Sequence, residues 1–165
     1  MITLLAADVA PPAPLVAVPF LPVWFELTVM TVNCLFGAAL ARSRSIGIYG
    51  TLAAGLMVGL GGGILRDLLL GQEPVAISQW YYIPAGIVGA LIGAIVFGGV
   101  LRSPKRFALL QGITLGFLVT IGAQKALSFQ TPLLSAVVLG VITATFGALA
   151  ADISMGHRET IIRQA

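Results

Sequence analysis

The sequence predicts an all-α membrane protein, a polytopic helical bundle built from two inverted repeats of three helices. Three observations support this class. First, 58% of the 165 residues are hydrophobic, only 9% are charged, and the mean hydropathy is +1.03, whereas about a quarter of residues are charged in soluble domains. Second, long uncharged stretches recur, too continuous for the alternating strands of a membrane barrel. Third, the chain matches itself after an ungapped shift of 85 residues.

Residues 1–22 are expected to form an N-terminal tail. Five prolines lie between Pro11 and Pro22 and forbid a continuous helix. The segment lacks the Lys or Arg that begins a signal peptide, so a cleaved signal is the minor alternative. The first helix is predicted over Val23–Ala41, with Trp24 placed like an interfacial anchor.

Four more helices follow. They are predicted over residues 48–67, 81–101, 107–127 and 132–153. A turn at Gly71–Pro74 separates the second helix from the third, because Gly and Pro commonly occur in turns and the residue before a proline disfavours the helical conformation. This divides the chain into repeat 1 (residues 23–101), a cytoplasmic linker (102–106) and repeat 2 (107–165) with two visible membrane helices.

Basic residues predict the orientation. The connections after the first, third and fifth helices carry most of the Lys and Arg: Arg42, Arg44, Arg102, Lys105, Arg106, Arg158 and Arg163. The positive-inside rule therefore places these connections in the cytoplasm and the N-terminus outside. The net charge of +3 reports this orientation. It does not indicate a nucleic-acid partner, which would need a basic soluble face.

The internal repeat is the most informative global feature. Eight identities occur over the 45 positions from Thr31 to Val75, among them Gly62 on Gly147 and Asp67 on Asp152. Because each repeat has an odd number of helices, the second copy enters the membrane upside down, and inverted repeats place a solute pathway at their interface. The third helix of repeat 2 would start beyond Ala165. The last helices are therefore expected to be missing from this chain, the alternative being a natural five-helix protein.

The run Gly61–Gly63 is the first candidate functional feature. Three consecutive glycines weaken a helix by roughly 1 kcal/mol each relative to alanine, and backbone groups freed in lipid need partners inside the protein. We therefore predict a break in the second helix with carbonyls available to a cation. A packing notch between helices is the alternative. The repeat mate Gly147 forms a milder break, beside the hydroxyl of Thr145.

Charges near membrane helices complete the candidate site. Asp67 and Asp152 are expected either to attract cations at the two mouths of a path or to cap and tether loops, and a further alternative is that Arg66 and Asp67 form a neutralised pair at a helix end. Lys125 snorkels to the interface, responds to voltage from inside the bundle, or pairs with one of the two acids. The predicted pore-lining or gating set is Gly61, Gly62, Gly63, Arg66, Asp67, Lys125, Thr145, Gly147 and Asp152.

Nothing in the sequence indicates an enzyme. No His, Cys, Asp and Glu cluster has metal-ligand spacing, and no serine sits in a nucleophile elbow. The glycine run lacks the preceding strand and following acid of a dinucleotide fingerprint. We therefore expect no catalytic residue, no metal site and no cofactor.

Two segments resemble a known family. Gly61–Gly71, followed by Pro74, and Ile121–Ala126 are similar to the prokaryotic trimeric intracellular cation channels, some of whose bacterial relatives are thought to transport glycine. The resemblance covers residues 31–156. It implies seven helices, a homotrimer in the prokaryotic inner membrane with possible bound lipid, and a potassium pore in each subunit. It places the kinks of the second and fifth helices at Gly61–Gly63 and Gly147. The family lysine maps onto Lys125.

This sequence departs from the family pattern in the second repeat. Gly147 stands alone where many relatives repeat the triplet and the arginine. The main hypothesis is a channel for monovalent cations, chiefly potassium, with its pore between kinked second and fifth helices, and with Arg66 and Lys125 adjusting selectivity or gating. The alternative is a secondary transporter for glycine or another small zwitterion. A structural membrane subunit without a pathway is the third hypothesis.

Overall fold

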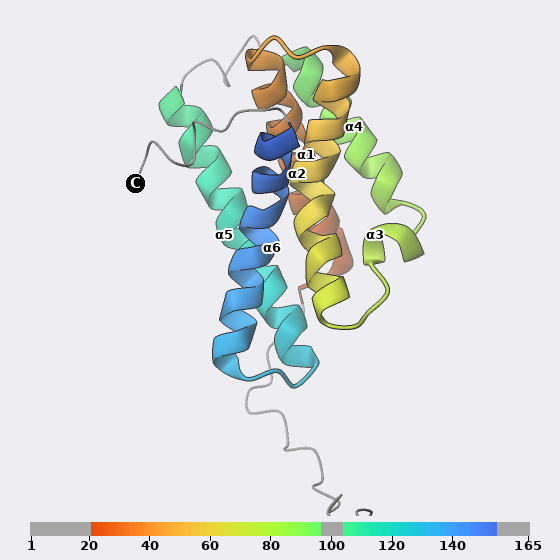
Figure 1. Cartoon of the computed structure of the whole chain (residues 1–165), viewed down its shortest axis with the longest axis vertical. Helices are drawn as coiled ribbons and strands as arrows, with labels where there is room; N and C mark the ends of the chain where they lie inside the picture. The colour runs from red at the N-terminus through yellow and green to blue at the C-terminus, as the bar shows by residue number, and fades with distance from the viewer. Residues whose placement is uncertain (1–20, 97–103, 155–165) are drawn as a thin grey trace, which may run out of the picture.

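A computed structural model describes residues 21–96 and 104–154. This part of the chain is helical throughout its regular structure (Figure 1). The elements are α1 (Val23–Ser43), α2 (Ile48–Leu69), α3 (Val75–Ser78), α4 (Tyr82–Val96), α5 (Pro104–Ser128) and α6 (Leu133–Ser154). Helices α1, α2, α5 and α6 are long and apolar enough to cross a membrane, and α4 is a shorter apolar helix.

The five predicted helices are present, with boundaries close to those expected from hydropathy. The short helix α3 was not predicted, and it begins directly after Pro74, where proline ends the preceding turn. Helix α5 begins at Pro104, within the stretch assigned to the linker, because proline is tolerated in a first helical turn. The predicted end of the third membrane helix at residue 101 lies outside the described residues, as do residues 1–20 and 155–165.

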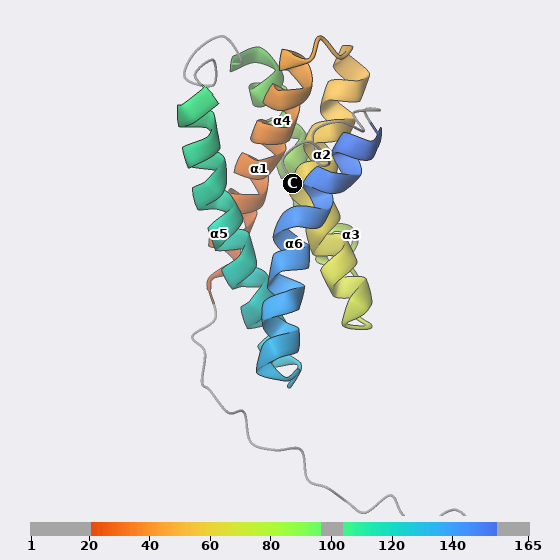
Figure 2. The ribbon, with the colours of Figure 1, turned by 60° about the vertical axis from the view of Figure 1, so that its left-hand side comes forward.

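The two long hairpins are inverted relative to each other. The turn between α1 and α2 lies at the top of Figure 1, and the turn between α5 and α6 lies at the bottom (Figures 1 and 2). Helix α6 packs along α2 and thereby joins the hairpins, while α4 packs on α1 and α2. Helices α1 and α5 meet over a smaller area. This arrangement is the inverted one that the odd number of helices per repeat predicts.

The ends of α1 and α5 show the repeat in the backbone itself. Ser45 and Gln130, which are 85 positions apart, are the described non-glycine residues with positive φ, at 59° and 57°. The amide of Arg44 donates to the carbonyl of Ala41 at 3.2 Å, and the equivalent amide of Phe129 donates to Ala126 at 3.0 Å. Both helices therefore end in the same left-handed cap, although the residues in that cap differ.

This cap predicts a stabilising substitution. Gln130→Gly is expected to raise the free energy of unfolding by about 1 kcal/mol, because glycine adopts positive φ without the steric penalty of a side chain. Ala108→Gly, at an exposed position inside α5, is the matched control and should lower it by about 1 kcal/mol. Thermal unfolding in detergent measures both. A lower midpoint for the Gln130 variant would contradict the left-handed cap.

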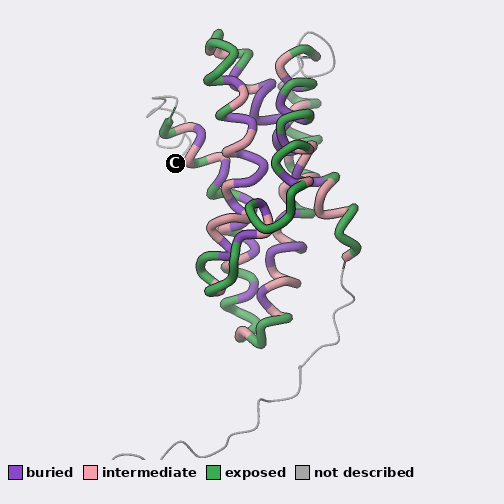
Figure 3. Tube along the Cα trace, turned by 90° about the vertical axis from the view of Figure 1, so that its right-hand side faces the viewer, coloured by how far each residue is buried: buried purple, intermediate pink, exposed green. Residues whose placement is uncertain are grey.

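Small residues form the centre of the bundle. Buried residues follow its middle and exposed ones its outer faces (Figure 3). Ala38, Ala39 and Ala41 are fully buried in α1. A Cβ added at Gly89 or Gly93 of α4 would overlap α1 backbone. Many large apolar side chains are exposed on the outer faces, which are therefore suited to lipid or to other membrane helices.

Candidate functional site

Helix α2 is not interrupted at the glycine run. It continues from Ile48 to Leu69, so the predicted break at Gly61–Gly63 was wrong. The reason is that α6 supports this stretch from the side, and tertiary packing overrides the weak helix propensity of glycine. The carbonyls of the run therefore lie within a continuous helix and are not released toward a cation.

The glycines instead allow α2 and α6 to cross closely. A Cβ at Gly62 would overlap the carbonyl oxygen of Thr143, and one at Gly61 would lie 3.4 Å from the Cα of Gly147. A Cβ at Gly147 would lie 2.5 Å from the carbonyl oxygen of Met57 in α2. The packing notch is thus the correct interpretation of Gly62 and Gly147. At these residues the two helices leave no space between them.

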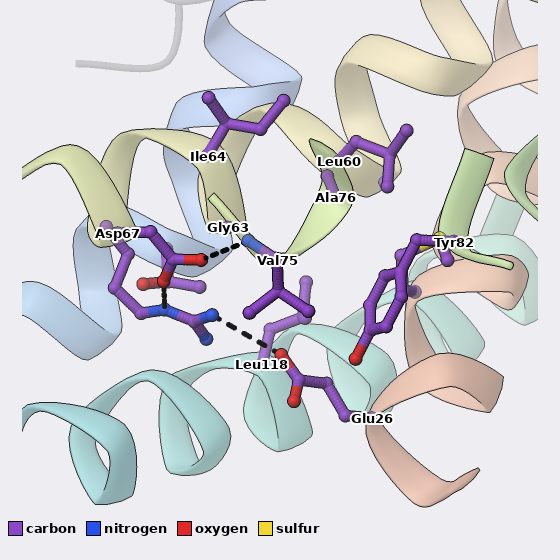
Figure 4. Close-up of a pocket in the computed structure, with 13 residues that line it drawn as sticks. Glu26, Leu60, Gly63, Ile64, Asp67, Val75, Ala76, Tyr82 and Leu118 are labelled. Carbon is purple, nitrogen blue, oxygen red and sulfur yellow. Dashed lines mark hydrogen bonds and ion pairs between the residues drawn. The ribbon is translucent and has the colours of Figure 1, made fainter. Parts of the chain in front are cut away.

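A charged cluster lies beside this crossing, at the C-terminal end of α2. Asp67 and Arg66 are 1% and 2% exposed. The Oδ1 atom of Asp67 forms ion pairs with Nε of Arg66 at 2.8 Å and with Nζ of Lys125 at 2.9 Å. Its Oδ2 atom accepts a hydrogen bond from the backbone N–H of Val75, the first residue of α3, at 3.0 Å (Figure 4). Three donors therefore hold Asp67. Of the three environments predicted for Lys125, the structure shows the pair with Asp67.

Glu26 of α1 completes the cluster, although it is absent from the predicted pore-lining or gating set. Its Oε1 atom lies 3.4 Å from Nη2 of Arg66, and the hydroxyl of Tyr82 points toward its carboxylate (Figure 4). Its one sequence signal is that it interrupts an otherwise apolar stretch beside Trp24. The cluster thus has two carboxylates and two bases, from α1, α2 and α5.

Two cavities border this cluster. The smaller, about 30 Å³, is lined by residues from all six helices and has room for about one or two waters. Arg66, Asp67, Tyr82 and Gly63 are among its lining residues. The larger, about 330 Å³, lies between the start of α1 and the end of α5 and is mostly apolar, with Lys125 in its wall. Glu26 lines both.

A second ion pair lies at the opposite end of the bundle. Nη1 of Arg44, the residue after α1, lies 2.7 Å from Oδ1 of Asp152 in α6. Asp67 and Asp152 are repeat mates, and each binds a base at the end of the first helix of the other repeat, Lys125 and Arg44 respectively. The two pairs are therefore reciprocal links between the repeats, one at each end.

The predicted site residues do not all come together. Arg66, Asp67 and Lys125 form the cluster, Gly63 lines the smaller cavity, and Asp152 lies at the other end. Thr145 is exposed on α6 and donates to the carbonyl of Val141 at 2.8 Å. Within residues 21–96 and 104–154, no three His, Cys, Asp or Glu side chains are grouped so as to hold a metal.

Known proteins share this sequence pattern and fold. A family model described as glycine transporter matches residues 23–98 and 108–165. The UPF0126 inner membrane protein YadS of Escherichia coli K12 is 28% identical over 145 residues, which are 85% of this chain and 69% of that protein. A UPF0126 membrane protein of Vibrio cholerae is 30% identical over 133 residues, 77% of this chain and 54% of its own length. The chain thus spans about half of the Vibrio protein.

Solved structures extend the comparison. A trimeric intracellular cation channel orthologue from Rhodobacter sphaeroides superimposes with a TM-score of 0.75 and 29% identity, covering 87% of this chain and 74% of that one. A second cation channel structure of the same kind gives a TM-score of 0.72 and 26% identity, covering 84% of this chain and 69% of the other. The resemblance to these channels that the glycine and lysine segments predict is confirmed.

Proposed function

The chain belongs to the glycine transporter family, it shares its fold with solved cation channels, and we propose that it is a membrane channel for monovalent cations, chiefly potassium. The shared fold is the observation that carries this proposal. The membrane helices and the relatives' names agree with a membrane protein. The proposal includes a homotrimer with one path in each subunit, surrounded by lipid in a prokaryotic inner membrane, with the N-terminus outside.

We place the path beside the crossing of α2 and α6. Gly62 and Thr143 close the crossing itself. The larger cavity lies between α1 and α5, and Glu26 of α1 lines both cavities that border the charged cluster. A cavity with room for about one or two waters is too small for a continuous hydrated path, so the proposal assigns this arrangement to the closed channel. Opening requires the repeats to separate at the cluster.

In this proposal Lys125 is the gating residue. Its Nζ atom holds Asp67 of the other repeat, and a membrane potential acts on its charge with about 2.3 kcal/mol per 100 mV if the charge crosses the whole field. Release of Lys125 frees one side of Asp67 toward a cation. Arg66 stays bound to Asp67 and limits how strongly a cation is held.

Planar-bilayer recording of the purified protein tests the proposal. With potassium and sodium on opposite sides, we expect unitary currents whose reversal potential lies toward that of potassium. Folded protein that gives no unitary current in either ion would contradict the channel.

Transport of glycine is the second candidate, and the composition of the cluster favours it. The carboxylates of Glu26 and Asp67 and the guanidinium of Arg66 border the smaller cavity, and Lys125 binds Asp67 from the wall of the larger one. This set of charges complements a solute carrying one ammonium and one carboxylate group. Saturable uptake of labelled glycine into proteoliposomes, without unitary current, would decide for the carrier. Both measurements use the same purified protein.

A further inference from the structure

The contact between Arg66 and Glu26 is the longest ion pair of the cluster. It measures 3.4 Å, whereas the bonds of Asp67 to Arg66 and Lys125 measure 2.8 and 2.9 Å. Glu26 is also the more accessible acid, because its side chain is 25% exposed and that of Asp67 is 1% exposed. Of these two carboxylates, Glu26 is the one that a solute can reach and the one that is held less tightly.

The position of Glu26 is equally specific. Its side chain lines both the larger cavity at the end of the bundle and the smaller cavity behind it. A solute that enters through the larger cavity meets mostly apolar walls, with charged groups of Glu26 and Lys125 among them. The Nζ atom of Lys125 is already bound to Asp67, so the carboxylate of Glu26 is the available partner for a positive charge.

We propose that the carboxylate of Glu26 binds the positively charged group of the transported solute, a monovalent metal ion or an ammonium group, at the mouth of the path. This inference rests on the proposed function and names its binding residue. The positive group replaces Nη2 of Arg66 at Oε1 of Glu26. Arg66 keeps its bond from Nε to Asp67, so after the exchange both Arg66 and Glu26 still have a partner of opposite charge. A buried charge without such a partner would be costly.

The two solute classes differ in what they do to Arg66. The carboxylate of a zwitterion can bind the Nη2 atom that Glu26 releases, so the cluster stays neutral. A bare metal ion adds one positive charge next to Arg66 and is held more weakly. Weak binding suits rapid conduction, because an ion must leave as readily as it enters. A zwitterion is therefore expected to saturate the site at a lower concentration than potassium.

Glu26→Gln tests this role, with Glu73→Gln as the matched control. Glu73 is exposed in the turn after α2 and is among the lining residues of neither cavity. Relative to wild type, Glu26→Gln should reduce the potassium current by at least about threefold at potassium concentrations well below saturation, because a local carboxylate concentrates cations. The reduction should shrink toward none at saturating potassium. Glu73→Gln should follow the wild-type curve.

The measurement of glycine uptake into proteoliposomes uses the same variants. Here Glu26→Gln should raise the KM of uptake about tenfold, the scale of one lost bond to a charged group, with the maximal rate little changed. A merely structural partner of Arg66 would instead lower the current or the uptake by the same factor at every concentration. That uniform loss, or curves for Glu26→Gln and wild type that coincide, would overturn the proposal.

Glu26→Asp keeps the test decisive if the glutamine variant does not fold. Aspartate retains the charge but sets it back by one methylene, so the half-saturating concentration should rise while the maximal rate is kept. An unchanged half-saturating concentration would overturn the role of Glu26. Wild-type protein with neither current nor uptake would instead overturn the proposed function itself.

Discussion

Gly62→Ala is expected to lower the free energy of unfolding by about 2–3 kcal/mol, near the upper end of the cost of overpacking. The added methyl group would overlap the carbonyl oxygen of Thr143. That oxygen belongs to the backbone of α6, so it cannot rotate away as a side chain would. Helices α2 and α6 must then move apart, and the close crossing that joins the repeats is lost.

Gly63→Ala is the matched control in the next position of the same helix. A Cβ at Gly63 would meet nothing within 4 Å. Alanine should therefore raise the free energy of unfolding by about 0.5–1 kcal/mol through helix propensity alone. Thermal unfolding of the two variants in the same detergent compares them. Equal midpoints would show that α2 and α6 do not cross closely at Gly62.

Asp67→Asn is expected to be the most destabilising change in the charged cluster, by about 3–5 kcal/mol. It removes the carboxylate closest to Arg66, whose side chain is 2% exposed, and the carboxylate that binds Lys125. Arg66 then keeps only its 3.4 Å contact with Glu26. A neutral amide cannot replace the negative charge of Asp67 beside Arg66 and Lys125. Asp67→Asn should consequently unfold at a markedly lower temperature than wild type.

The repeat mate provides the control for this change. Asp152→Asn breaks the pair with Arg44, whose side chains are 16% and 18% exposed. Water reaches these groups, so the free energy of unfolding should fall by about 1 kcal/mol or less. An equal loss in both variants would mean that the burial of the cluster around Asp67 does not determine its energy.

Much of the fold could be predicted from local composition. In a membrane, an uncharged stretch of sufficient length forms a helix because its backbone groups must bond within the segment. The boundaries of α1, α2 and α6 accordingly agree with hydropathy to within about two residues. The inverted hairpins followed from counting helices in an 85-residue repeat. The short helix α3 escaped because four residues carry no periodic signal.

The candidate site was only partly predictable. Arg66, Asp67 and Lys125 could be selected because charge in an apolar stretch is rare and expensive. Glu26 could not be connected with them, since it lies 40 positions from Arg66 along the chain. Thr145 was selected for its hydroxyl, but its helical phase turns it to the outside of α6.

The sequence by itself determined the membrane class, the inverted repeat and the identity of the rare charges, because these depend on composition and spacing along one chain. Tertiary structure alone decided what the glycines and charges do. The same glycine run is compatible with a broken helix and with a close crossing, and the backbone of Thr143 opposite Gly62 selects the crossing. Likewise, Lys125 had several possible environments, and the carboxylate of Asp67 on another helix selects one.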